Sequence, residues 1–162
     1  MIGFKASGKT TVGRQLATSL DWDFLDTDEE ICRVYGGGEI YEIYQTLGEY
    51  DFRALEHQVI VSIKPTRNTV IATGGGVVLN PLNIAWLKTL GPIIFLNTRL
   101  ELITHRLQGL NRQSPFLDLQ SIYLQRQALY FQAADQVIDC ADKLPVRIVK
   151  QLSQTIRAPN VE

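Results

Sequence analysis

The chain has 162 residues, 45% of them hydrophobic, and a formal net charge of −1 at pH 7. This length and apolar content suit a single domain over residues 1–162 with a sizeable core. A protein that binds nucleic acid or a membrane surface needs an excess of Lys and Arg to neutralise phosphates, and this chain has none. We therefore expect neither kind of partner.

Two cysteines, Cys32 and Cys140, lie far apart in the sequence and in no metal-ligand spacing. They are expected to be free thiols, buried or half-buried, in a reducing compartment. The sequence opens on a glycine-containing motif rather than on a signal peptide, and no apolar run approaches about 18 residues. These features predict a cytoplasmic protein.

Residues 3–10 read Gly-Phe-Lys-Ala-Ser-Gly-Lys-Thr, which matches the G-x-x-x-x-G-K-[ST] phosphate-binding loop. Gly3 and Gly8 permit backbone angles that turn consecutive N–H groups toward phosphate oxygens. Lys9 would reach the β- and γ-phosphates, and the Thr10 hydroxyl would coordinate Mg²⁺. Apolar residues at helical spacing follow the loop, so it is expected to open a helix whose N-terminus favours anions.

A phosphate-binding loop normally leaves a buried central strand, but only Met1 and Ile2 precede Gly3. A strand usually has about five residues. Either the first strand is very short, or the natural protein has residues before Met1. The sequence leaves both readings open.

Residues 20–25 alternate apolar and polar and predict a short strand that ends on Asp26-Thr27-Asp28, before a helix that starts at Glu29. Carboxylates at i and i+2 on a strand point the same way, so both would face the phosphates at the carboxyl edge of a parallel sheet. One would hold Mg²⁺, directly or through water, and the other would accept a hydrogen bond from a substrate hydroxyl. Acids also gather at helix N-termini for dipole reasons, but their place after a phosphate loop favours the functional interpretation.

The next segment predicts helices over residues 39–44 and 49–61, separated by a break at Gly48. Arg53 and Glu56 share one face of the second helix. They form either a surface ion pair, which would be worth little, or a clamp in which Glu56 holds Arg53 for a substrate anion.

A β-branched strand over residues 69–73 runs into three glycines, Gly74, Gly75 and Gly76. Glycines at a strand end allow a ligand to approach the backbone closely, although they also occur in ordinary turns. Asn80 and Pro81 then predict the cap and first turn of a helix.

The rest of the chain repeats the alternation of strand and helix. The expected elements are a buried strand at 91–96, a helix at 100–107, an apolar loop at 109–117, a helix at 122–133, a strand at 136–139 and a last helix at 146–156 opened by Pro145. Such alternation predicts a three-layer α/β/α fold, in which helices cover both faces of a parallel sheet and the crossovers are right-handed.

Together these motifs resemble the shikimate kinase family over nearly the whole chain. The phosphate-binding loop is shared by many families, whereas the helix with Phe52-Arg53-x-x-Glu56 followed by the triple glycine is specific. The resemblance is carried by residues 3–10, Asp26-Thr27-Asp28, Gly48-Glu49-x-x-Phe52-Arg53-x-x-Glu56, residues 72–76, and Arg126-x-x-Leu129-Tyr130 followed by Ala134-Asp135.

The resemblance implies a P-loop kinase fold with a five-stranded parallel sheet in the order 2-3-1-4-5, a lid at about residues 108–121 and a substrate-binding helical part at about 29–61. It also implies a monomeric enzyme that transfers the γ-phosphate of ATP, with Mg²⁺, to the 3-hydroxyl of shikimate in aromatic amino acid (chorismate) biosynthesis.

The resemblance further assigns roles at matching positions. Lys9, Asp28 and Arg112 would be catalytic, with Asp28 orienting or deprotonating the attacking hydroxyl, and Thr10 and Asp26 would bind the metal. Shikimate would contact Asp28, Phe52, Arg53, Glu56, Gly74, Gly75, Gly76 and Arg126, with Tyr44 as a further wall. ATP would contact Gly3, Ala6, Ser7, Gly8, Lys9, Thr10, Thr11, Arg106 and Pro145.

One position departs from the family pattern. The family's lid carries an arginine directly before a proline, and that arginine reaches the transferring phosphate; here Ser114 precedes Pro115, and the nearest arginine is Arg112. Either Arg112 acts from a shifted loop, or another cation substitutes, or the lid is disabled. Losing such a cation can cost about 10³ in rate.

Two other functions therefore stay open. A related kinase, such as one acting on gluconate, would share the loop and the sheet without requiring the Phe52-Arg53-x-x-Glu56 motif. A protein that binds shikimate or a nucleotide without useful catalysis is supported only by Ser114.

Overall fold

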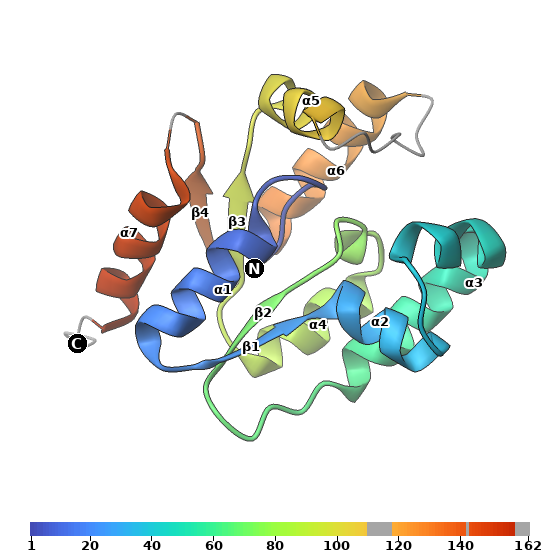
Figure 1. Cartoon of the computed structure of the whole chain (residues 1–162), viewed down its shortest axis with the longest axis horizontal. Coiled ribbons are helices and arrows are strands. Elements are labelled where there is room, and N and C mark those ends of the chain that lie inside the picture. Colours follow the sequence, from blue (N-terminus) through green and yellow to red (C-terminus); the bar gives the residue numbers. More distant parts are fainter. Residues whose placement is uncertain (110–117, 142, 158–162) are drawn as a thin grey trace.

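The computed structural model describes residues 1–109, 118–141 and 143–157 (Figure 1). Helices and short strands alternate along the chain, as predicted. The elements are α1 Lys9–Leu20, β1 Asp23–Asp26, α2 Thr27–Tyr35, α3 Ile40–Ser62, β2 Thr69–Ala72, the 3₁₀ turn η1 Val77–Leu79, α4 Pro81–Leu90, β3 Ile94–Asn97, α5 Leu100–Gly109, α6 Leu119–Ala133, β4 Gln136–Asp139 and α7 Pro145–Arg157.

The strands form two parallel pairs, β1 with β2 and β3 with β4. The segment before the phosphate-binding loop lies between the pairs. The Ile2 N–H donates to Ile94 O (2.8 Å), the Leu96 N–H donates to Ile2 O (3.0 Å), and the Thr73 N–H donates to Met1 O (3.1 Å). Ile2 makes only an isolated parallel bridge with Phe95, so the described residues contain four strands rather than five.

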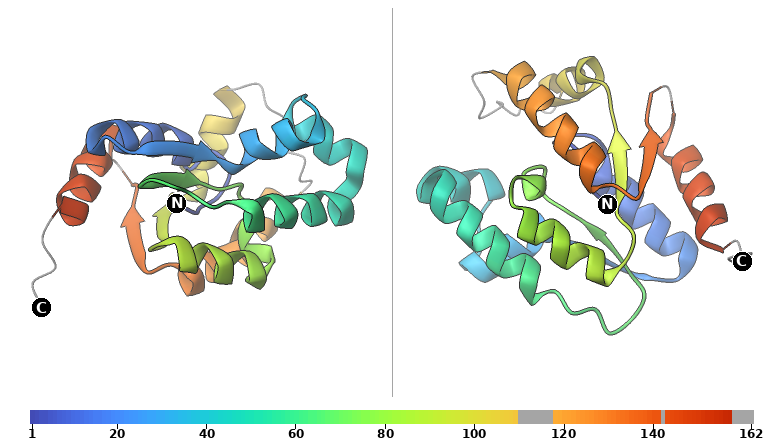
Figure 2. Two further views of the ribbon diagram at one scale, coloured as in Figure 1. Left: turned by 90° about the horizontal axis from the view of Figure 1, so that it is seen from below. Right: turned by 180° about the vertical axis from the view of Figure 1, so that it is seen from behind.

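Helices cover both faces of these strands (Figure 2). α1 and α7 pack together on one face, while α4 and α6 lie on the other. The side chains of strand β3 pack alternately into two cores. Ile94 and Leu96 belong to the core beneath α1 and α7, and Phe95 belongs to the opposite core. This alternation follows from the two-residue period of a strand.

A third apolar cluster joins α2 to α3 at the end of the molecule that holds these two helices. Helix α3 changes direction at Gly48, whose φ of 74° and ψ of 172° are not helical. These angles confirm the predicted break at Gly48. Glycine suits this position because a residue with a side chain rarely adopts such a positive φ.

Some predicted boundaries were wrong. Helix α2 begins at Thr27, with Asp26 as its N-cap, so Asp28 lies in the first helical turn and not on a strand end. Helix α6 begins at Leu119, before the predicted start, because Asp118 caps it by accepting a hydrogen bond from the Ser121 N–H. The predicted loop at 109–117 falls largely outside the described residues, as do Arg112, Ser114 and Pro115.

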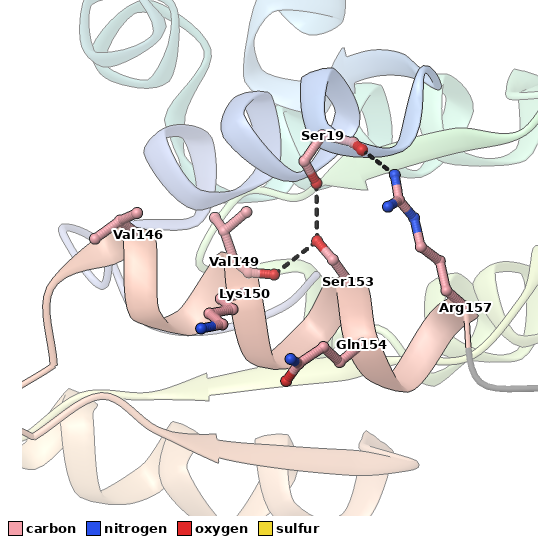
Figure 3. A pocket seen from close by; sticks show the side chains of 7 residues that line it. All are labelled: Ser19, Val146, Val149, Lys150, Ser153, Gln154 and Arg157. Atoms are coloured by element: carbon pink, nitrogen blue, oxygen red, sulfur yellow. Dashed lines mark hydrogen bonds between the residues drawn. The ribbon is translucent and has the colours of Figure 1, made fainter.

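Helix α7 carries a strongly one-sided apolar face, with Ile148 and Leu152 in the core beside α1. At the surface the two helices enclose a shallow hollow, where the Ser19 and Ser153 hydroxyls lie 2.8 Å apart and Arg157 donates to the Ser19 carbonyl (Figure 3). None of the described helices is long and apolar enough to cross a membrane.

Replacing the fully buried Leu152 by alanine should lower the free energy of unfolding by about 2–5 kcal/mol, because the deletion leaves a cavity beneath α7. Urea unfolding measures this change. Val146→Ala is the control, since Val146 lies on the same helix but is exposed, and it should change stability by less than about 0.5 kcal/mol. Equal effects of the two substitutions would contradict the packing described here.

Candidate active site

A cleft of about 1130 Å³ opens at the carboxyl ends of the strands. This is the edge at which open parallel sheets bind ligands, because loops and helix N-termini converge there. Its walls come from the phosphate-binding loop, the start of α2, both halves of α3, the glycine segment, α5, α6 and the start of α7. The lining residues used below are Lys5, Ala6, Ser7, Gly8, Lys9, Thr10, Thr11, Asp26, Asp28, Tyr44, Phe52, Arg53, Glu56, Gly74, Gly75, Gly76, Arg106, Arg126, Lys143 and Pro145.

The side chain of Lys9 bonds to the backbone of its own phosphate-binding loop. The buried Lys9 ammonium donates to the carbonyls of Gly3 (2.9 Å) and Phe4 (2.8 Å). Gly8, with φ 100°, leads directly into α1. Gly3 lies under the loop and does not line the cleft; a Cβ there would lie 2.9 Å from Leu96 O. The loop therefore presents backbone N–H groups and the N-terminus of α1 to an anion.

Burial lowers the pKa of Lys9 to about 8, although the nearby charges of Asp28 and Asp26 act to raise it. An ammonium with a depressed pKa gains from a phosphate, because an added negative charge offsets the missing water. The loop is thus prepared for a polyanion rather than for a neutral ligand.

Asp26 joins the loop to α2. Its Oδ2 accepts a hydrogen bond from the Thr10 hydroxyl (2.7 Å), and its Oδ1 accepts one from the Asp28 N–H (3.0 Å). A hydroxyl and a carboxylate at the N-terminus of α1 suit Mg²⁺, which prefers oxygen ligands and keeps most of its coordination for water and phosphate. Since no group of three potential acidic, histidine or cysteine ligands exists in the described part of the chain, a metal here would rely on a bound phosphate.

Asp28 stands between the two charged ends of the cleft. Burial, followed by the neighbouring Asp26 charge, raises its pKa to about 6; the charges of Lys9 and Arg53 act to lower it. A Cβ on Gly74 would lie only 2.6 Å from Asp28 Oδ1, so only glycine leaves room for this carboxylate. A carboxylate with a raised pKa is a better proton acceptor near neutral pH.

The opposite end of the cleft carries two arginines. Arg53 Nη1 donates to the buried Glu56 Oε2 (2.9 Å), and Arg53 Nε donates to Glu49 Oε1 (2.7 Å). Burial raises the pKa of Glu56, while Arg53 opposes that rise. The pair is thus no surface ion pair, since the Glu56 side chain is 2% exposed.

Arg126 on α6 is also buried, and its Nη1 donates to Gly75 O (3.2 Å). The same carbonyl accepts from Tyr130. A Cβ on Gly76 would lie 2.2 Å from Arg53 Nη1, so the glycine segment lets both guanidinium groups converge. Two converging guanidinium groups bind a carboxylate or a phosphate well.

The structure brings together in this cleft every predicted site residue except Gly3, which supports the loop, and Arg112, which lies outside the described residues. At the end that holds the phosphate-binding loop, Arg106 Nη1 donates to Ala6 O (2.9 Å) and Pro145 lines the wall. At the other end, the rings of Tyr44 and Phe52 meet edge to face, with centroids 5.2 Å apart.

Sequence reasoning missed some contributors. Glu49, named only as part of the motif, bonds both Arg53 and the Tyr44 hydroxyl across the break at Gly48. Its i,i+4 spacing to Arg53 would have found the first contact, but the second depends on the turn at Gly48. His57 Nδ1 lies 2.7 Å from Asn83 Oδ1 on α4, a tertiary contact without a sequence signal.

Parallel strands between layers of helices, with a phosphate-binding loop at their carboxyl ends, are the arrangement of the P-loop kinases. The family model of shikimate kinases matches residues 5–157. The chain therefore belongs to the shikimate kinase family.

The shikimate kinase of Caldanaerobacter subterraneus is 44% identical over 107 residues, which cover 66% of this chain and 62% of that protein. That of Hahella chejuensis is 34% identical over 168 residues, covering 100% of this chain and 87% of that protein. Among solved structures, the shikimate kinase of Acinetobacter baumannii in complex with shikimate matches with a TM-score of 0.84 and 32% identity, covering 99% of this chain and 93% of that chain.

Replacing Asp28 by Asn should stabilise the unliganded protein at pH 8 by roughly 1–2 kcal/mol, because it removes a charge that burial disfavours. The folded pKa lies above the unfolded one, so this cost is complete above about pH 6 and vanishes below about pH 4, where Asp28 is protonated in both states. Urea unfolding at pH 8 and pH 4 measures the difference. A stabilisation that is the same at both pH values would contradict a buried charge at Asp28.

Proposed function

We propose that this protein is a shikimate kinase, which transfers the γ-phosphate of Mg-ATP to the 3-hydroxyl of shikimate. One observation carries the proposal: a single cleft holds a phosphate-binding loop at one end and the Arg53 and Arg126 guanidinium groups at the other, with Asp28 in electrostatic reach of both Lys9 and Arg53. A kinase for a small anionic alcohol needs these three features in this order.

At the nucleotide end, the loop N–H groups and Lys9 would bind the β- and γ-phosphates, and Thr11, Arg106 and Pro145 would border the nucleoside. Thr10 and Asp26 would hold Mg²⁺, which supplies charge neutralisation at the phosphates when bound. Support comes from the Thr10–Asp26 hydrogen bond, because a hydroxyl and a carboxylate oxygen are ligands of the kind that Mg²⁺ prefers.

At the acceptor end, Arg53 and Arg126 would bind the substrate carboxylate, with Glu56 and Glu49 fixing Arg53. Backbone groups of Gly74, Gly75 and Gly76 would border the ring, and Phe52 and Tyr44 would form its apolar wall. The Asp28 carboxylate would accept the proton of the attacking hydroxyl. A gluconate-type kinase is less well supported, because a flexible polyol would not require this wall or the close fit of Gly76 against Arg53.

We also propose a monomer that acts in aromatic amino acid biosynthesis in the cytoplasm. Residues of about 29–61 would form its substrate-binding helical part, and residues of about 108–121 would form a lid with Arg112 as the lid cation. The segment at Met1 and Ile2 would serve as the central strand. If it is counted as the first of five strands, so that β1 to β4 become the second to the fifth, the order across the sheet is 2-3-1-4-5. The segment's hydrogen bonds to both strand pairs support that order.

Release of ADP by the purified protein with Mg-ATP tests the function. We expect release that depends on shikimate and not on gluconate. Release with gluconate alone would favour the other kinase. Binding of shikimate and Mg-ATP without ADP release would favour the reading as a binding protein without useful catalysis.

Arg53→Ala should raise the KM for shikimate on the order of 10²-fold, because one half of the carboxylate clamp is lost while Glu56 is left buried and unpaired. The KM for ATP should change far less. Steady-state kinetics with each substrate varied in turn measure both constants. Arg33→Ala is the matched control, since Arg33 is an exposed arginine on α2 in a similar i,i+3 ion pair. Equal rises in both KM values would remove Arg53 from the acceptor site.

A further inference from the structure

The phosphate-binding loop contains a second lysine, Lys5, to which the motif assigns no role. Only the glycines, Lys9 and Thr10 are fixed by the pattern, so the second variable position, held here by Lys5, accepts many side chains. Lys5 is half-buried and lines the same cleft as Lys9. It therefore adds a cation where the motif does not require one.

The backbone around Lys5 lies against the acceptor side of the cleft. A Cβ built on Gly75 would lie 3.1 Å from Lys5 N and 3.5 Å from Phe4 C, so the loop and the glycine segment are in direct contact here. The Gly75 carbonyl is fixed by hydrogen bonds from Arg126 and Tyr130. The Arg126 guanidinium also lies 5.8 Å from the centre of the Phe4 ring.

The next residue already faces the nucleotide side. Ala6 has a φ of 61°, and its carbonyl accepts from Arg106. The loop thus passes from the acceptor to the nucleotide between Lys5 and Ala6. The backbone of Lys5 therefore lies where the loop meets the acceptor side, and the γ-phosphate is the part of ATP nearest to the acceptor.

The arginines in the described part of the cleft lie toward its two sides. Arg53 is held by Glu49 and Glu56, and Arg126 is held by Gly75, both on the acceptor side. Arg106 is bound to the loop on the nucleotide side, where Lys143 and Pro145 also lie along the wall. Lys5 and Lys9 are the two cations that the phosphate-binding loop itself contributes to the cleft.

We propose that the Lys5 ammonium contacts the transferring phosphoryl group and stabilises it in the transition state, an inference that rests on the proposed kinase function. In this step the acceptor oxygen forms a bond to the γ-phosphorus, and the bond from that phosphorus to the β–γ bridging oxygen breaks. The bridging oxygen leaves with its electron pair on ADP, and the hydroxyl proton goes to Asp28. Lys5 and Lys9 flank the equatorial oxygens, on which charge is concentrated.

The test compares Lys5→Met and Lys5→Arg with the wild-type protein in steady-state kinetics. Methionine keeps the length of the side chain and removes its charge. We expect Lys5→Met to lower kcat on the order of 10²-fold, the usual effect of removing one transition-state donor, with KM values for shikimate and Mg-ATP changed by less than about threefold. Lys5→Arg keeps a positive charge and should recover most of the lost kcat.

Lys64→Met provides the matched control, because Lys64 is exposed in the loop after α3 and does not line the cleft. It should leave kcat unchanged. Fluorescence titration with Mg-ADP should give the same affinity for the wild type and Lys5→Met, which would show an intact nucleotide site.

Two results would overturn the inference while leaving the kinase intact. One is an unchanged kcat in Lys5→Met; the other is a raised KM for shikimate at constant kcat, which would make Lys5 a contact of the bound acceptor instead. Absence of shikimate-dependent ADP release by the wild-type protein would overturn the proposed function, and the inference about Lys5 with it.

Discussion

The hydrogen bonds of Met1 and Ile2 to both strand pairs are the constraint on which the site depends. They hold the start of the chain between β2 and β3, so the phosphate-binding loop must emerge at the carboxyl ends of the strands. Asp26, at the end of β1, and Gly74, just beyond β2, reach the same edge for the same reason. Parallel pairing therefore brings residues from distant parts of the sequence to one cleft.

The charged side chains divide the cleft into two cationic ends with carboxylates between them. The loop and Lys9 form a cationic end, Arg53 and Arg126 form a second, and the carboxylates of Asp26 and Asp28 separate them. Without ligands, burial disfavours the charges on both Lys9 and Asp28. An anionic ligand would offset this cost for Lys9, because an added negative charge replaces the water that burial removes.

Much of this arrangement could be predicted because local patterns specified it. Apolar periodicity predicted the order of helices and strands, and the motif residues around Lys9, Arg53 and Gly76 were predicted as parts of one site. Features that depend on helix caps or on contacts across a turn were missed, because local patterns do not encode them. Asp28 was placed on a strand although the Asp26 cap starts α2 earlier, and the contact of Glu49 with Tyr44 depends on the turn at Gly48. The role of Arg112 stays a prediction.

The crystal structure of a complex with Mg-ADP and shikimate would test the central claim, that one cleft aligns nucleotide and acceptor across Asp28. The account predicts the shikimate carboxylate between Arg53 and Arg126, with one ring hydroxyl within about 2.6–3.2 Å of the Asp28 carboxylate and facing the nucleotide. A shikimate carboxylate bound away from both arginines, or a ring whose hydroxyls face away from the phosphate-binding loop, would contradict it.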